Sequence, residues 1–241
     1  MIPYFKEPVF HAGRVVITSY AASAATAIAV SGWTTLRRGC DQGIPAEGMF
    51  RLWFWMCACA VAGALAPGQV QHPGEVSLST LGAICGGPVG AVCWALYHRL
   101  SVFEVFRRLE IMAYTFPLAW MFGRFGCTLA HDHRGVTSLS WLAVQFPEGP
   151  RWDLGFLEFL FLAAVGVLFR VLDRRPRPVG FFFVSFALLY AGFRGWIDTL
   201  REQPHYLDVI AGLCIAAAGI ALMRVPQSAE VRPAPGRPIR P

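Results

Sequence analysis

Seven apolar runs, each long enough to form a membrane-spanning helix, constrain the fold of this sequence more than any other feature. A helix needs about 20 apolar residues to cross the hydrocarbon core of a bilayer. The runs are Val15–Leu36, Met49–Ala66, Leu78–Tyr97, Ile111–Leu129, Leu154–Leu172, Val179–Ile197 and Leu207–Met223. They predict an all-α polytopic membrane protein with about seven transmembrane helices.

The composition leaves no room for a large soluble domain. Of the 241 residues, 55% are hydrophobic and 15% are charged, whereas soluble domains usually contain about 25% charged residues. Residues 1–224 are therefore predicted to form a single transmembrane domain. Residues 225–241 are rich in Pro, Arg and Ala, which predicts a disordered tail. The segment Met1–His11 lacks a basic region followed by a cleavage motif, so we expect no removable signal peptide.

The distribution of basic residues predicts the orientation in the membrane. If the N-terminus lies outside, fourteen arginines lie on the cytoplasmic side: Arg37, Arg38, Arg51, Arg99, Arg107, Arg108, Arg170, Arg174, Arg175, Arg177, Arg224, Arg232, Arg237 and Arg240. Five basic residues then lie on the other side: Lys6, Arg14, Arg134, Arg151 and Arg201. The positive-inside rule places the N-terminus outside and the C-terminal tail in the cytoplasm. Topology thus accounts for the net charge of +6, and we expect no nucleic-acid partner.

Polar residues near the outer ends of four separate spans form the main candidate site. They are Tyr20, Arg124, Glu158, Arg194 and Asp198, with Arg201 just beyond the sixth span. An unpaired Arg within a bilayer costs at least about 2.5–3.5 kcal/mol, so such residues normally face a partner or a cavity and mark a functional site. The spacing therefore predicts a charged functional layer near the outer face.

Arg194, Asp198 and Arg201 fall on one helical face because they are separated by four and three positions. Asp198 can pair with both arginines, which would make the trio self-neutralising. Alternatively, one Asp leaves a surplus of positive charge, to which Arg124 adds. Surplus guanidinium groups suit an anionic lipid phosphate, because Arg binds phosphate in bidentate fashion.

The end of the fourth span combines glycines with titratable residues. In Gly123-Arg124-Phe125-Gly126, the glycines permit close approach of a neighbouring helix or a ligand. His131, Asp132 and His133 follow. A metal site there would need further ligands, for which His72 and His205 are the nearby candidates. A surface turn is favoured over a metal, and a proton-handling role for one His is a further alternative.

These residues together resemble the bacterial prolipoprotein diacylglyceryl transferase family. The resemblance runs from Tyr20 to about Met223. It is carried by Tyr20, Gly123-Arg124-Phe125-Gly126, Asp132, Gly135, Glu158, Tyr190, Phe193-Arg194, Asp198 and Arg201. The position of the Gly-Arg-x-Gly element at the outer end of the fourth of seven spans makes the match more specific than the motif alone.

The resemblance implies a reaction at the outer face of the bacterial cytoplasmic membrane. Phosphatidylglycerol would donate its diacylglyceryl group to the lipobox cysteine thiol of a prolipoprotein signal peptide, without a cofactor or a metal. Tyr20, Arg124 and Arg194 are implied to be catalytic. The implied substrate-binding residues are Gly123, Gly126, Asp132, His133, Gly135, Glu158, Asp198 and Arg201. The partners are membrane lipid and the precursor peptide.

Several positions depart from the family pattern. The family usually has His-Gly-Gly at the outer start of the third span, and this chain has Leu81-Gly82-Ala83; the Asn that usually follows Gly-Arg-x-Gly is Cys127. Either His131 or His133 supplies the lost base, or the thiol ionises without a dedicated one, or the chain transfers a different group. A non-catalytic protein that binds or handles phospholipid is the alternative function.

Overall fold

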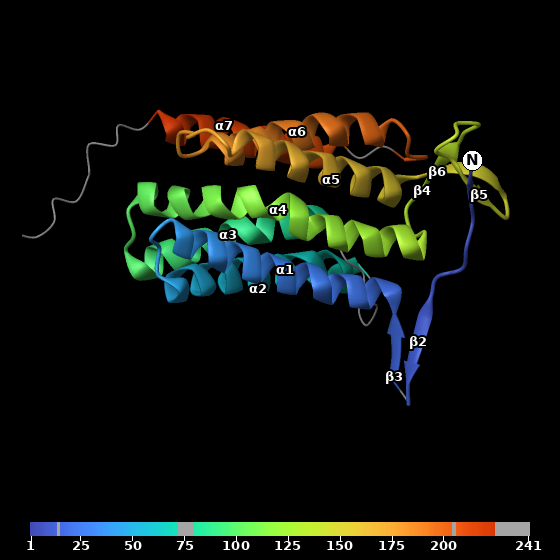
Figure 1. Cartoon of the computed structure of the whole chain (residues 1–241), viewed down its shortest axis with the longest axis horizontal. Helices are drawn as coiled ribbons and strands as arrows, with labels where there is room; N and C mark the ends of the chain where they lie inside the picture. Colours follow the sequence, from blue (N-terminus) through green and yellow to red (C-terminus); the bar gives the residue numbers. More distant parts are fainter. Residues whose placement is uncertain (14, 72–79, 204–205, 225–241) are drawn as a thin grey trace, which may run out of the picture.

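The computed structural model describes residues 1–13, 15–71, 80–203 and 206–224. The described residues contain seven α-helices, which run along the long axis of the molecule (Figure 1). The helices are α1 Ser19–Asp41, α2 Ala46–Gln71, α3 Thr80–His98, α4 Val102–Ala130, α5 Leu154–Leu172, α6 Phe181–Asp198 and α7 Leu207–Met223. Each overlaps one of the seven predicted runs.

Three of these helices are long and apolar enough to cross a membrane by length and composition. They are α2 over Ala46–Ala66, α5 and α6. Helix α7 is apolar but shorter. The chain is therefore a mostly helical protein with membrane-spanning character, which agrees with the predicted class.

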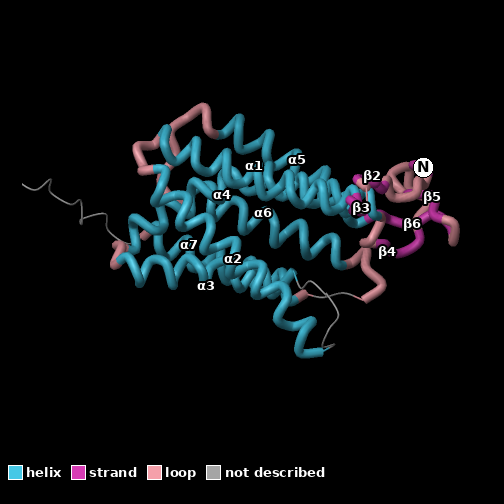
Figure 2. Tube along the Cα trace, turned by 90° about the horizontal axis from the view of Figure 1, so that it is seen from below, coloured by secondary structure: helices cyan, strands magenta, loops and turns pink. Residues whose placement is uncertain are grey.

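Short β-strands are the main departure from the predicted all-α fold. Strands β1 Ile2–Pro3, β5 Val144–Phe146, β6 Gly149–Asp153 and β4 Arg134–Thr137 form one sheet in that order, with β1 parallel to β5 and the other pairs antiparallel. Residues 130–153, which separate the fourth and fifth predicted runs, thus contain three strands. The sheet lies at one end of the helix bundle, here called the sheet end, and α7 ends at the opposite end (Figures 1 and 2).

The first helix begins later than predicted, at Ser19 instead of Val15. The β-branched run Val15–Thr18 forms strand β3, which pairs antiparallel with β2 Val9–Ala12. The side chain of Thr18 then caps α1 by accepting a hydrogen bond from the Ala21 amide at 3.1 Å. Because Thr satisfies an otherwise unpaired N–H here, the helix begins at the next residue.

Glycines set the contact between α2 and α3. A Cβ added at Gly86 would lie 2.9 Å from the carbonyl carbon of Cys59, and one added at Gly90 would lie 2.6 Å from the carbonyl oxygen of Trp55. Both distances are shorter than a side chain can tolerate, so the two backbones can meet only where Cβ atoms are missing. Close packing of α2 against α3 therefore depends on these two glycines.

Two polar contacts join the helices at the end opposite the sheet. Glu110 of α4 accepts hydrogen bonds from the backbone amides of Phe182 and Phe183 at 2.8 Å each, which satisfies two free N–H groups in the first turn of α6. Arg38 of α1 donates to both carboxylate oxygens of Asp173, at 2.9 and 2.6 Å, just after α5. These contacts connect α4 with α6 and α1 with the end of α5 at this end of the bundle.

The Arg38–Asp173 pair predicts a pH-dependent contribution to stability. The hydrogen bonds from Arg38 lower the pKa of the Asp173 carboxyl. A carboxyl group with a lowered pKa in the folded state stabilises the fold above its unfolded value of about 3.9, and this contribution is lost as the pH falls through the folded pKa. We expect Asp173→Asn to unfold at a lower temperature than wild type at about pH 7, with the difference shrinking below about pH 4.

Thermal unfolding in detergent, followed by tryptophan fluorescence, measures this difference. Every other carboxyl group is shared by the two proteins, so its effect cancels in the comparison. A difference that stays constant from neutral to acid pH would contradict the prediction.

Candidate active site

A cluster of buried charged residues connects the sheet-end halves of α4, α5, α6 and α7. Its first element is an ion pair between Arg124 of α4 and Glu158 of α5, with Arg124 Nε 3.0 Å from Glu158 Oε1. Only 6% of Arg124 and 1% of Glu158 is exposed. The hydroxyl of Tyr190 donates to the same Oε1 at 2.9 Å. Glu158 therefore has partners on two neighbouring helices.

Arg194 of α6 forms the second element of the cluster. Its Nε and Nη2 donate to Asp208 Oδ2 at 3.0 and 2.7 Å, and its Nη1 lies 3.6 Å from Glu158 Oε2. Glu158 thus stands between the two guanidinium groups, one at each carboxylate oxygen. The carboxylate offsets their mutual repulsion and holds both at fixed positions.

Asp198 pairs with both neighbouring arginines, which is one of the two arrangements that the sequence left open. Asp198 Oδ1 lies 3.0 Å from Arg201 Nε and 3.9 Å from Arg194 Nε. Arg194 and Asp198 are buried, whereas the side chain of Arg201 is 21% exposed. Of these three residues, Arg201 is the one that reaches the surface of the cluster.

Asp208 is the residue of the buried cluster that the sequence analysis missed, and the pocket residues Arg134, Glu202 and Gln203, described below, were not predicted either. It lies in the first turn of α7, where an acidic residue suits the positive end of the helix dipole, and an acidic residue at the start of an apolar run was the available signal. With Asp208 and Glu158 included, three arginines (Arg124, Arg194 and Arg201) face three carboxylates (Glu158, Asp198 and Asp208). The expected surplus of positive charge is wrong for this cluster, because α5 and α7 supply carboxylates.

The predicted site glycines, Gly123 and Gly126 of α4 and Gly135 of β4, differ in their surroundings. A Cβ added at Gly126 would lie 2.9 Å from the Ser23 side chain and 3.3 Å from the Tyr20 carbonyl, so this glycine lets α1 pack against α4 and brings Tyr20 to the sheet end of α4. A Cβ at Gly135 would lie 2.6 Å from the Leu200 carbonyl oxygen. By contrast, Gly123 has space for a side chain, with its nearest neighbour at 3.9 Å. The close approach of a neighbouring helix that the Gly-Arg-x-Gly motif predicts is therefore confirmed at Gly126, where the neighbouring helix is α1.

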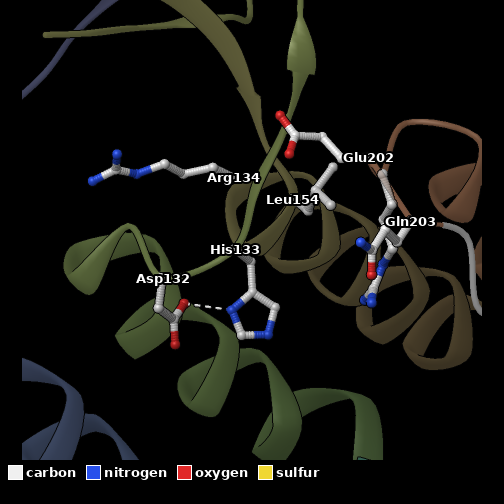
Figure 3. A pocket seen from close by; sticks show the side chains of 7 residues that line it. Asp132, His133, Arg134, Leu154, Glu202 and Gln203 are labelled. Atoms are coloured by element: carbon white, nitrogen blue, oxygen red, sulfur yellow. Dashed lines mark hydrogen bonds and ion pairs between the residues drawn. The ribbon is translucent and has the colours of Figure 1, made fainter. Parts of the chain in front are cut away.

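A pocket of about 330 Å³ opens beside the cluster (Figure 3). Its lining residues are Asp132, His133, Arg134, Leu154, Arg201, Glu202 and Gln203. Two of them touch one another, since His133 Nδ1 lies 2.6 Å from Asp132 Oδ1. On the other side of the ring, His133 Nε2 lies 3.3 Å from Arg124 Nη1. His133 therefore connects the pocket to the buried ion-pair cluster.

The two histidines of the His131-Asp132-His133 segment lie in different environments. His131, 4% exposed, contacts the rings of Tyr4, Phe5 and Phe146 and lies with Nδ1 2.6 Å from Asp153 Oδ2. Burial raises the pKa of the Asp153 carboxyl, against the lowering effect of the His131 hydrogen bond. His131 thus joins the N-terminal segment to the sheet, while His133 faces the pocket.

The metal fragment considered from the sequence does not form as a His131–His133 pair. A different set, Cys127, Asp132 and His133, places its ligand atoms within 4.8 Å of one another. Arg124 Nη1, however, lies 3.9 Å from Cys127 Sγ and 3.3 Å from His133 Nε2, and this positive charge disfavours a cation. The two remaining candidate ligands, His72 and His205, lie outside the described residues.

Comparison with known proteins gives one family. A family model described as prolipoprotein diacylglyceryl transferase matches residues 7–225. Similar curated proteins are the phosphatidylglycerol–prolipoprotein diacylglyceryl transferases of Chromohalobacter salexigens, 31% identical over 60% of this chain and 58% of that protein, and of Bordetella avium, 30% identical over 59% and 57%. The protein of Clostridium perfringens named phosphatidylglycerol–prolipoprotein diacylglyceryl transferase 2 is 24% identical over 52% of this chain and 50% of that protein.

The aligned parts of the chain thus span a little over half the length of these relatives at most. The family model, by contrast, extends from before α1 to the end of α7 and includes every residue of the buried cluster. On this match, the chain belongs to the prolipoprotein diacylglyceryl transferase family.

Proposed function

We propose that this protein transfers the diacylglyceryl group of phosphatidylglycerol to the cysteine thiol of a prolipoprotein. The observation that carries the proposal is the buried cluster around Glu158, which holds Arg124 and Arg194 at its two carboxylate oxygens and connects to the pocket through the contact of Arg124 with His133. Membership of the family supports the reaction type. The names of the similar proteins specify phosphatidylglycerol and prolipoprotein as their substrates.

The membrane arrangement is part of the proposal. All seven helices would cross a bacterial cytoplasmic membrane, with the sheet end and Met1 outside and residues 225–241 as a cytoplasmic tail. Two observations support this arrangement: Met1 and the end of α7 lie at opposite ends of the bundle (Figure 1), and the basic residues accumulate on the side of the C-terminus. Residues 1–224 would act as a single domain.

The proposed chemistry is a displacement at carbon. The thiolate sulfur of the acceptor attacks the glyceryl carbon that carries the phosphate, a C–S bond forms and the C–O bond breaks. The electron pair of the broken bond stays on the phosphate oxygen, and glycerol phosphate leaves. Arg124 and Arg194 would stabilise the charge that develops on this oxygen. Each guanidinium carries five N–H donors, so an arginine paired with carboxylates can still donate to a phosphate.

The other predicted site residues would position the substrates. Tyr20, brought to α4 by Gly126, would orient the head group, and the space at Gly123 would admit it. Arg201, Asp132 and His133 line the pocket where the acceptor or the glycerol phosphate would lie. Glu158 and Asp198 would hold the arginines, and Gly135 would hold β4 against the end of α6. No cofactor or metal enters this scheme.

One observation favours the alternative, a phospholipid-binding protein without catalysis. Leu81, in the first turn of α3, occupies the place where the family resemblance implies a His. The two functions differ in their products, because a binding protein would leave phosphatidylglycerol intact.

The decisive experiment incubates the purified protein with phosphatidylglycerol labelled in the diacylglyceryl group and a lipobox peptide. The proposal expects label on the peptide and release of glycerol phosphate, but no label on a peptide with Ser in place of Cys. Phosphatidylethanolamine with the same label tests the choice of head group. Binding of phosphatidylglycerol without transfer, together with failure to sustain a strain depleted of its own transferase, would establish the alternative.

A further inference from the structure

The imidazole of His133 is held at both ring nitrogens, and its two partners differ in chemistry. Asp132 Oδ1 lies 2.6 Å from Nδ1, and Arg124 Nη1 lies 3.3 Å from Nε2. An ionised carboxylate only accepts hydrogen bonds, and a guanidinium only donates them. Nδ1 therefore carries the proton and donates to Asp132, while the lone pair of Nε2 faces Arg124.

This orientation is the one that a general base requires. A carboxylate bonded to Nδ1–H fixes the tautomer and stabilises the imidazolium that forms when Nε2 takes up a proton. The charged or titratable groups around the ring from neighbouring elements are Asp132 before β4, Arg124 and Cys127 of α4, Tyr20 of α1, Arg134 of β4, and Arg201 and Glu202 after α6. Among the described residues that line the pocket, His133 is the one with a neutral nitrogen lone pair.

His133 is accessible from the pocket, whereas His131, the other described histidine at the N-terminal end of β4, is not. The side chain of His133 is 32% exposed and lines the pocket, whereas that of His131 is 3% exposed and packs among aromatic rings. A thiol that enters the pocket can reach His133 without movement of the backbone. His131 does not line the pocket and is enclosed by the rings of Tyr4, Phe5 and Phe146.

We propose that His133, oriented by Asp132, accepts the proton of the acceptor thiol during diacylglyceryl transfer. This inference rests on the proposed function. The S–H bond breaks, its proton moves to Nε2, and the resulting thiolate forms the C–S bond as the C–O bond to phosphate breaks. The proton then passes from Nε2 to the departing phosphate or to water in the pocket, which returns His133 to its starting state.

Arg124 connects the base to the lipid. Its Nη1 covers the lone pair of His133 and belongs to the guanidinium that would bind the lipid phosphate. A phosphate oxygen, being negatively charged, competes for this N–H more strongly than a neutral imidazole does. Binding of the lipid therefore frees Nε2, so the thiol is deprotonated when the donor is already in place.

The test compares wild type, His133→Ala, His133→Gln and Asp132→Asn in the transfer assay from about pH 6 to pH 9. At neutral pH we expect about 10²-fold slower transfer for both His133 variants, within the usual contribution of a general base. Above the ordinary thiol pKa of about 8.5 the peptide ionises by itself, so the deficit should shrink. Added imidazole should partly restore His133→Ala but leave wild type unchanged.

A selenocysteine analogue of the lipobox peptide provides the sharper control. A selenol is ionised at neutral pH and needs no base, so wild type and His133→Ala should differ far less with it than with the thiol. His131→Gln is the matched variant: it should lower the unfolding temperature but keep the wild-type ratio between the selenol and thiol rates.

The outcomes separate this inference from the proposed function. If His133→Ala transfers to the thiol peptide at the wild-type rate throughout the pH range, His133 is not the base. A deficit that is equal for thiol and selenol, and constant with pH, also overturns the inference, because it indicates a positioning role. If wild type transfers to neither peptide, the proposed function itself fails.

Discussion

Arg124→Lys should lower the rate of diacylglyceryl transfer by about 10²–10³-fold while the protein remains folded. The guanidinium of Arg124 makes contacts in different directions, with Nε toward Glu158 and Nη1 toward His133 and Cys127. A lysine carries one compact charge at the end of a flexible chain and cannot reach these partners together. It does keep a positive charge near the buried Glu158, so the fold should survive.

Labelled phosphatidylglycerol and a lipobox peptide measure this effect, with thermal unfolding in detergent as the check on folding. Arg51→Lys is the matched control, because Arg51 forms an exposed ion pair with Glu47 at the opposite end of the bundle. It should transfer at the wild-type rate. Wild-type activity in Arg124→Lys would show that the geometry of the guanidinium is not needed.

Arg194→Ala should destabilise the protein by about 3–5 kcal/mol, as expected when one partner of a buried ion pair is removed. Arg194 is 2% exposed, and its loss would leave Asp208 and Glu158 with less positive charge to compensate them. A loss of transfer in Arg194→Ala would therefore not by itself assign Arg194 a role in catalysis. With alanine at this position, the buried carboxylates of Glu158 and Asp208 would lose a positively charged partner, and the folded state would be destabilised.

A double-mutant cycle tests this explanation. Asp208→Asn removes the negative charge that Arg194 neutralises, so Arg194→Ala/Asp208→Asn should be more stable than Arg194→Ala alone. The unfolding temperature in detergent is measured for the two single variants, the double variant and wild type. Equal stability of Arg194→Ala and wild type would contradict the prediction, as would additive effects of the two substitutions. If the double variant is folded, the ratio of its transfer rate to that of Asp208→Asn reports on the loss of Arg194.

The sequence by itself determined the seven helices and the end of the bundle at which the charged residues gather. Apolar runs long enough to cross a bilayer gave the position of each helix, because a helix rises a fixed 1.5 Å per residue. The same constant rise placed Arg124, Glu158 and Arg194 near one end of their helices, and these side chains do meet there. Helical periodicity alone placed Asp198 and Arg201 on one face of their helix, where they do pair.

Only the tertiary structure decided which side chains pair within this layer. Depth along a helix does not fix its rotation or its neighbours, so the position of Glu158 between two arginines and the role of Asp208 depended on how α5 and α7 pack. The short strands also depended on distant partners, since β1 pairs with β5 from the other half of the chain. These same strands bury His131, whereas His133 remains at the pocket. The difference between the two histidines therefore comes from packing, which their spacing in the sequence does not contain.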